Sequence, residues 1–141
     1  ENKICELSKK LKDTIIFVVA DHGHLNEEDI FLKDYPDILE CLERVPSVEP
    51  KATAFFIKDG KKEEFKNLFN KYFGEYFDLY TKEEVIDSKL FGDGEENSKF
   101  RSELGDYLAI SHTKKAFIYE GDYPLYSQHA GYTDDEIYIY H

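Results

Sequence analysis

The feature that most constrains the fold is an uncharged run, TIIFVVA at residues 14–20, which ends directly on Asp21, His22 and Gly23. Its β-branched and aromatic residues favour a strand covered on both faces, as in a parallel sheet between two layers of helices. In open α/β sheets, ligands bind beyond the carboxyl ends of the strands. The run therefore predicts an α/β fold and marks the Asp-His pair at its end as a candidate site.

Hydrophobic periodicity elsewhere predicts helices and strands that alternate along the chain. Phe65 and Phe69 fall at helical spacing before Gly74, and Thr81 with Glu84 forms the capping-box pattern that opens a helix. The predicted helices cover residues 2–12, 37–44, 61–73 and 81–88, and the predicted strands cover residues 14–20, 52–58, 77–80, 107–110, 116–119 and 137–140. Elements in this order indicate an α/β fold with a partly parallel sheet flanked by helices.

Two local connections are also predicted. Asn26 is expected to cap a turn that carries residues 27–30. The strands at residues 107–110 and 116–119 are separated by a short polar segment and are expected to form a hairpin across it.

The chain has 141 residues, enough for one modest domain with a core of its own. We expect a single α/β domain or fragment, in which residues 1–45 and 115–141 carry the candidate site and residues 46–114 form an intervening α/β segment. The formal net charge of −12 would repel a phosphate backbone, which argues against binding to nucleic acid. A local metal site would still attract an anion, because the field of a nearby dication outweighs distant surface charge.

Neither cysteine nor any apolar segment points to an oxidising or membrane environment. Cys5 and Cys41 are isolated in sequence, so reduced thiols are expected rather than a disulfide framework. No run of about 18 apolar residues and no secretory signal is visible. We therefore expect no membrane contact by this segment and a cytoplasmic location.

Asp21 and His22 are adjacent, and on a regular strand their side chains would point to opposite faces of the sheet. Gly23 allows the backbone to turn sharply, so that both side chains can converge. A carboxylate oxygen and an imidazole nitrogen suit zinc, and also manganese or iron. A plain surface turn after the strand explains the same residues, so the pattern alone leaves both interpretations open.

His129 is the second candidate ligand, because it lies in QHAGYTDDE with Gly131 two residues later and an acidic, capped segment behind it. A loop histidine without a ligand also explains this pattern. The remaining histidines lack such a context, and we expect them to contact solvent or hydrogen-bond partners: His24, His112 and His141. The acids behind the motif are expected to be first-turn residues favoured by the helix dipole: Asp134, Asp135 and Glu136.

Taken together, these motifs resemble a known family. ADHG after an apolar strand, followed much later by QHAGYTDDE, is similar to the C-terminal half of the alkaline phosphatase superfamily, in particular its type I phosphodiesterase/nucleotide pyrophosphatase branch. The segments RVPSVEPKATAFFIKDGKKEEF and FRSELGDYLAIS also resemble uncharacterised bacterial members of that branch. The resemblance covers most of the chain.

The resemblance implies a phosphoester hydrolase that uses two divalent metal ions, zinc or else manganese. Asp21 and His22 match the adjacent pair that binds one ion, and His129 matches the late histidine that binds the other. The family's Thr or Ser nucleophile, an early Asp and an Asp-x-x-x-His pair precede the Asp-His-Gly strand and have no match in residues 1–20. We therefore expect a C-terminal fragment with an incomplete metal site, inactive without the N-terminal half of its parent. The parent is expected to act on a small phosphorylated or nucleotide-like substrate.

The chain departs from the family pattern at two points. Ala130 stands where the family commonly has Gly or Ser, and IYIYH at residues 137–141 replaces a Met-x-Val-Pro-Leu-like segment. The second departure affects the packing of a final strand rather than a ligand. Two other functions stay open. One is a related metal-dependent phosphosugar mutase, which shares Asp-His-Gly but lacks the late His-x-Gly. The other is a non-catalytic α/β module for protein contacts.

Overall fold

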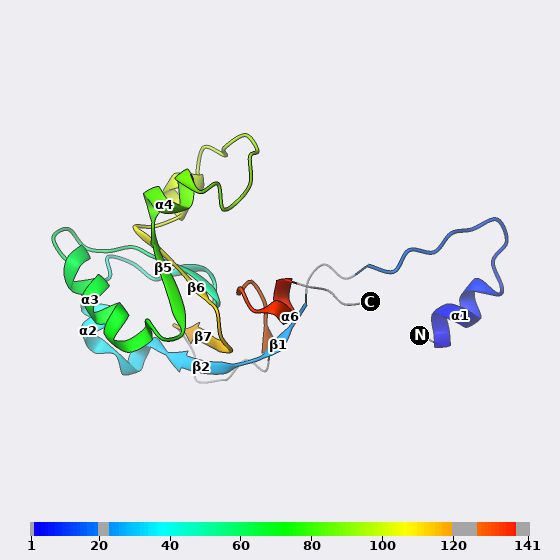
Figure 1. Cartoon of the computed structure of the whole chain (residues 1–141), viewed down its shortest axis with the longest axis horizontal. Helices are drawn as coiled ribbons and strands as arrows, with labels where there is room; N and C mark the ends of the chain where they lie inside the picture. Colours follow the sequence, from blue (N-terminus) through cyan, green and yellow to red (C-terminus); the bar gives the residue numbers. More distant parts are fainter. Residues whose placement is uncertain (1, 20–22, 120–126, 138–141) are drawn as a thin grey trace.

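The computed structural model describes residues 2–19, 23–119 and 127–137. Figure 1 shows a main body of strands and helices, with α1 standing apart from it beyond an extended segment. The helices are α1 (Asn2–Ser8), the 3-10 helix η1 (Leu32–Asp34), α2 (Pro36–Cys41), α3 (Lys62–Phe73), α4 (Lys82–Asp87), α5 (Phe100–Glu103) and α6 (Asp134–Ile137). The strands are β1 (Leu25–Asn26), β2 (Glu28–Phe31), β3 (Ser47–Glu49), β4 (Ala52–Phe55), β5 (Phe77–Thr81), β6 (Tyr107–Ser111), β7 (Lys115–Ile118) and β8 (Ser127–Gln128).

A four-stranded antiparallel sheet in the order β3-β4-β6-β5 forms the centre of the body. The side chains of β6 alternate between its two faces: Tyr107 and Ala109 enter one apolar cluster, while Leu108 and Ile110 enter the other. Burial on both faces explains why residues 108–110 of this strand are all apolar. The sheet is therefore covered on both sides, as the sequence predicts for an α/β fold.

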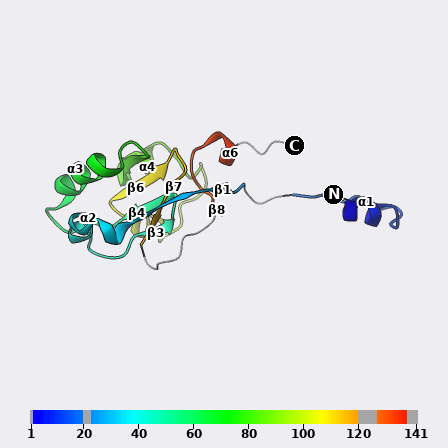
Figure 2. The same ribbon diagram turned by 90° about the horizontal axis from the view of Figure 1, so that it is seen from below.

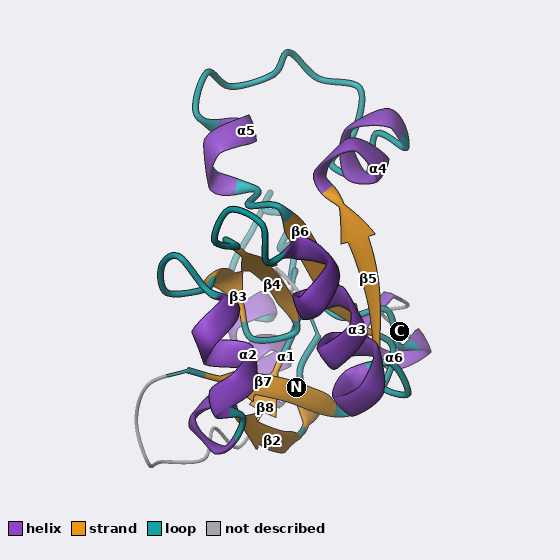
Figure 3. Ribbon diagram, turned by 90° about the vertical axis from the view of Figure 1, so that its left-hand side faces the viewer, coloured by secondary structure: helices purple, strands orange, loops and turns teal. Residues whose placement is uncertain are grey.

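Helices supply the two covers. On one face, α3 presents Phe65, Phe69 and Phe73, spaced four residues apart and all 0% exposed, to the sheet. On the other face, Val85 of α4 packs with Leu104, which follows α5. Figures 1 and 2 show α2 and α3 at the end of the body that lies away from α6. Figure 3 shows α4 and α5 grouped beyond the ends of β5 and β6.

Phe117 of β7 joins a second pair of strands to the larger cluster. Its ring centroid lies 4.2 Å from that of Phe77, 5.0 Å from Phe73 and 5.6 Å from Phe55. Phe117→Ala is expected to lower the free energy of unfolding by about 3–5 kcal/mol, because removing a buried ring leaves a cavity. Urea unfolding measures this loss, with Phe91→Ala as the control at a ring that is 59% exposed. A loss under about 1 kcal/mol at Phe117 contradicts the packing described.

Strand β7 pairs in parallel with β2, and this pair supplies the parallel part of the architecture. The predicted hairpin between residues 107–110 and 116–119 is therefore wrong, because both edges of β6 are already occupied by β4 and β5. The predicted turn at residues 27–30 is also wrong, since most of it belongs to β2. In both cases the partner strand is distant in sequence, so local turn signals did not reveal it.

The predicted strand at residues 14–20 is not observed over residues 14–19, and Ala20 lies outside the described residues. Residues 14–19 pair with no strand in the described parts of the chain, and Figure 1 shows them running from α1 toward the body. Their side chains are exposed, with Ile15 at 80%, Phe17 at 82% and Val19 at 87%. A strand needs a neighbour for its backbone N–H and C=O groups, and none of the described strands pairs with this segment.

The remaining local predictions fare better. The helices expected at residues 37–44 and 61–73 appear as α2 and α3, the first of them shorter than predicted. The capping box is confirmed: Thr81 N donates to Glu84 Oε2 at 2.7 Å, and Glu84 N donates to Thr81 Oγ1 at 3.2 Å. Of the final predicted strand, residues 138–140 lie outside the described residues. No described helix combines the length and the apolar composition needed to cross a bilayer.

Candidate functional site

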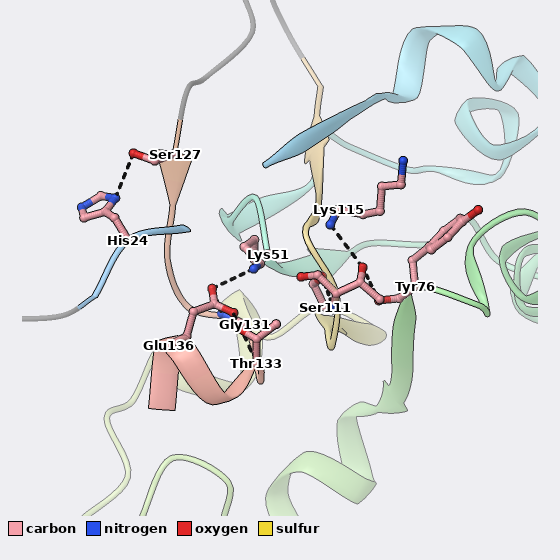
Figure 4. Close-up of polar contacts among 10 residues, drawn as sticks. His24, Lys51, Tyr76, Ser111, Lys115, Ser127, Gly131, Thr133 and Glu136 are labelled. Atoms are coloured by element: carbon pink, nitrogen blue, oxygen red, sulfur yellow. Dashed lines mark hydrogen bonds and ion pairs between the residues drawn. The ribbon is translucent and has the colours of Figure 1, made fainter. Parts of the chain in front are cut away.

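A short antiparallel ladder brings the two candidate segments together. β1 pairs with β8, with Leu25 opposite Gln128. Next to this ladder, the rings of His24 and His129 meet edge to face, with centroids 5.5 Å apart and an interplanar angle of 74°. Ser127 Oγ lies 3.4 Å from Nδ1 of His24, as Figure 4 shows. The chain just after the Asp-His pair is therefore held beside the chain that carries His129.

Asp21 and His22 themselves lie outside the described residues. Their neighbour Gly23 is described, and a Cβ built on it would lie 3.1 Å from the carbonyl oxygen of Asp135 in α6. In the described parts of the chain, no three His, Cys, Asp or Glu side chains are grouped so as to hold a metal ion. The ligand assignments at positions 21, 22 and 129 remain predictions.

The turn after His129 has an unusual backbone. Ala130 has a φ of 74°, in the left-handed region that a non-glycine residue adopts only at a cost. This explains why Gly is suited to the position at which this chain carries Ala. The following residue, Gly131, has no room for a side chain: a Cβ would lie 2.7 Å from Lys51 Cε and 2.9 Å from the Ser111 carbonyl oxygen. The loop that carries His129 thus packs tightly against Lys51 and Ser111.

A buried ion pair lies behind this loop. Lys51 Nζ is 2.8 Å from Glu136 Oε1, and the two side chains are 0% and 3% exposed. Burial opposes ionisation of Glu136, but Lys51 and hydrogen bonds from Thr133 and Gly131 hold its pKa below its usual range. The acid predicted to be a simple first-turn residue is therefore a buried partner of a lysine as well.

Glu27, between β1 and β2, joins the same group of charges. Both of its carboxyl oxygens are buried and have no hydrogen-bond partner among the described residues. Burial raises the pKa of Glu27 from 4.5 to about 7. The negative charges of Asp29 and Glu136 also raise this pKa, whereas the positive charge of Lys51 lowers it. The cluster thus contains more carboxylates than cations, and one of its acids holds a proton near neutral pH.

Glu27 is expected to make stability depend on pH. Its pKa is higher in the folded protein, at about 7, than the usual 4.5, so the folded state binds this proton more tightly between these values. The stability from protonated Glu27 is therefore full below about pH 4.5 and is lost as the pH rises to about 7. Glu27→Gln removes this dependence. The melting temperature of the variant minus that of the unaltered protein should therefore be larger at about pH 8 than at about pH 5.

The matched control for this measurement is Glu95→Gln, in an exposed loop. Its difference in melting temperature from the unaltered protein is expected to be the same at both pH values. An equal shift for Glu27→Gln at both pH values would show that Glu27 ionises as an ordinary exposed acid.

The other candidates occupy the expected settings. His112 has a hydrogen-bonding role, with Nε2 3.2 Å from the Glu75 carbonyl oxygen. Asp134 and Asp135 stand exposed in the first turn of α6. Both cysteines are free thiols, Cys41 buried and Cys5 exposed. His141 lies outside the described residues.

His24 has the hydrogen-bonding role expected for it, with Nδ1 3.4 Å from Ser127 Oγ, whereas the burial of Lys51 was not predicted. His24 stands two residues after His22 and immediately before β1, so pairing of β1 with another strand was the only signal that could have placed it. Lys51 immediately precedes the apolar strand β4, where a lysine is ordinarily taken as a solvated strand end. Its full burial depends on Glu136, which lies far away in sequence.

Comparison with known proteins gives matches of fold only. No protein family and no curated protein sequence matches the chain. The structure of murine ectonucleotide pyrophosphatase/phosphodiesterase 5 matches with a TM-score of 0.55 and 19% identity, over 79% of this chain and 28% of that one. An inactive variant of the murine protein in complex with AMP gives 0.54 and 20% over the same shares, and the human protein gives 0.54 and 19%.

This chain shares their fold. The match covers the mixed α/β arrangement of parallel and antiparallel strands flanked by helices, which is similar to the alkaline-phosphatase-like fold of those proteins. The chain spans 28% of the length of the solved structures that it matches. At 19–20% identity the likeness concerns the architecture, and the chemistry has to be argued from the site.

Proposed function

We propose that this chain is the C-terminal part of a metal-dependent phosphoester hydrolase of the phosphodiesterase or nucleotide pyrophosphatase type. Two observations support the proposal. The first is the fold shared with ectonucleotide pyrophosphatase/phosphodiesterase 5, one structure of which is a complex with AMP. The second, which carries the proposal, is the β1–β8 ladder that sets the ring of His24 5.5 Å from that of His129. His24, which follows the Asp-His pair closely in sequence, thus lies beside His129.

In this proposal Asp21 and His22 would bind one divalent ion, and His129 would bind a second. Carboxylate oxygen and imidazole nitrogen form a donor set that suits zinc, and also manganese. Two such ions, when bound, would supply Lewis-acid stabilisation of the charge on a phosphoryl group. The ions would also offset the net charge of −12, which otherwise repels a phosphorylated substrate.

The rest of the reaction is assigned to the parent protein. A Thr or Ser nucleophile, an early Asp and an Asp-x-x-x-His pair are expected upstream of residue 1, in the N-terminal half that completes both metal sites. The substrate is expected to be a small phosphorylated or nucleotide-like ester. Three ligands divided between two ions complete neither metal site. The isolated 141-residue chain is therefore expected to bind metal weakly and to hydrolyse no ester.

The test is a phosphoesterase panel on the full-length protein. Phosphate monoesters, phosphate diesters and dinucleotide-type pyrophosphates are assayed with zinc, manganese and magnesium, alongside the isolated chain. Metal-dependent hydrolysis of at least one ester class by the full-length protein alone is the expected result. If the full-length protein hydrolyses none of them with any metal, the hydrolase proposal fails. A strong metal-dependent rate from the isolated chain contradicts the incomplete site.

A further inference from the structure

The ion pair behind the loop that carries His129 is energetically costly, because both of its charges are buried. Lys51 and Glu136 are almost wholly removed from water, with side chains 0% and 3% exposed. The desolvation penalty of two buried charges usually exceeds the free energy gained from their attraction. Well-packed apolar residues in the same place commonly give the folded protein equal or greater stability. A buried pair of this kind is therefore better explained by fixing one conformation of the chain than by adding stability.

The contacts of Glu136 identify the arrangement that is set. Its Oε1 accepts a hydrogen bond from Gly131 N at 3.1 Å and faces Lys51, while its Oε2 accepts from Thr133 N at 3.3 Å and from the Thr133 hydroxyl. All of these donors other than Lys51 lie in the turn at residues 130–133, directly after His129. Figure 4 shows Glu136 between this turn and Lys51.

The turn is also fixed to the central sheet. Tyr132 N donates to the Ser111 carbonyl oxygen at 2.8 Å, and Ser111 N donates to the Lys51 carbonyl oxygen at 2.8 Å. Lys51, which immediately precedes β4, is therefore linked to the turn by its side chain through Glu136 and by its backbone through Ser111. Gly131 packs so closely against these partners that a Cβ there would lie 2.7 Å from Lys51 Cε and 2.9 Å from the Ser111 carbonyl oxygen.

We infer that Lys51 and Glu136 are a positioning pair, which fixes the turn at residues 130–133 against β4 and β6 and thereby orients His129 toward its metal ion. Neither residue touches the ion. Their effect passes through Gly131 and Thr133 to the backbone of His129, in the way that outer hydrogen-bond partners orient metal ligands. The inference rests on the proposed function for the metal, but the fixing of the turn itself does not.

The test compares variants of the full-length protein. Lys51→Met and Glu136→Gln each break the pair. Lys51→Met with Glu136→Leu removes both charges, so that no unpaired charge is left buried if either single variant fails to fold. Lys89→Met is the matched control, because its ion pair with Asp93 lies on the surface with side chains 68% and 79% exposed.

Two readouts are taken. Zinc affinity, measured by competition with a chelator, is expected to fall about 10- to 100-fold in the pair variants and to stay unchanged in the Lys89→Met control. Amide hydrogen exchange of the metal-free protein is expected to speed up about 10-fold or more at Gly131 and Tyr132 in the pair variants, with the amides of α3 unaffected. Excess zinc should restore much of the hydrolysis lost by the pair variants.

The outcomes separate the two proposals. If the double variant is folded and its zinc affinity and its exchange at Gly131 and Tyr132 equal those of the unaltered protein, the positioning role is overturned. A lower melting temperature with unchanged zinc affinity and exchange also overturns it, because the pair would then be only structural. If the unaltered protein hydrolyses no ester but the turn loosens in the pair variants, the hydrolase proposal fails and the fixing of the turn stands.

Discussion

Replacing His129 by alanine in the full-length protein is expected to lower metal-dependent phosphoester hydrolysis by more than about 100-fold. Loss of an outer partner of a metal ligand already costs about 10- to 100-fold, so loss of the ligand itself should cost more. His22→Ala is expected to have an effect of the same size. The ratio kcat/KM measures the loss, and the zinc content of each purified variant should fall together with it.

The control is a histidine in another role. His112 has Nδ1 3.4 Å from the Asp78 carboxylate and Nε2 3.2 Å from the Glu75 carbonyl oxygen, and its side chain is 37% exposed. His112→Ala should leave the rate and the zinc content unchanged. Thermal unfolding establishes that each variant is folded. If folded variants at positions 22 and 129 retain the full rate, the site assignment is wrong although the fold assignment would stand.

The elements that sequence could predict are those whose information is local. Three aromatic residues in α3 recur at helical spacing and define its buried face. Thr81 and Glu84 supply both halves of a capping box within four residues. The α/β class follows from the order of such elements, and it needs no knowledge of which strands pair.

Pairing of distant strands was not predictable in the same way. β7 follows β6 closely in sequence but joins β2, whose register places Ile30 opposite Phe117. A hairpin signal between β6 and β7 could not show that both edges of β6 were already taken. The same limit explains why the burial of Lys51 and the contact between His24 and His129 were not predicted, because each depends on a partner far along the chain. Sequence could therefore name His22 and His129 as candidates, but it could not show what holds them.

The apolar run at residues 14–19 is expected to make the isolated chain self-associate. Phe17 and Val19 are 82% and 87% exposed, and the run has no charge and no paired neighbour among the described residues. Such unpaired apolar segments are templates for pairing with another chain. In the proposed full-length protein, the same run would be an inner strand, with these side chains buried. One sequence is thus expected to have opposite effects in the two settings.

Phe17→Asp and Val19→Asp are therefore expected to act in opposite directions. In the isolated chain each should reduce association, measured by sedimentation velocity over a range of protein concentrations. In the full-length protein each should lower the free energy of unfolding by more than about 3 kcal/mol, because a carboxylate would replace a buried apolar group.

Thr14→Asp is the matched control for these variants, since it adds the same charge at the start of the run. It should change association slightly and leave the stability of the full-length protein within about 1 kcal/mol. If Phe17→Asp and Val19→Asp leave the full-length protein as stable as this control, the run is not an inner strand there. The upstream half would then have to complete the site without covering residues 14–19.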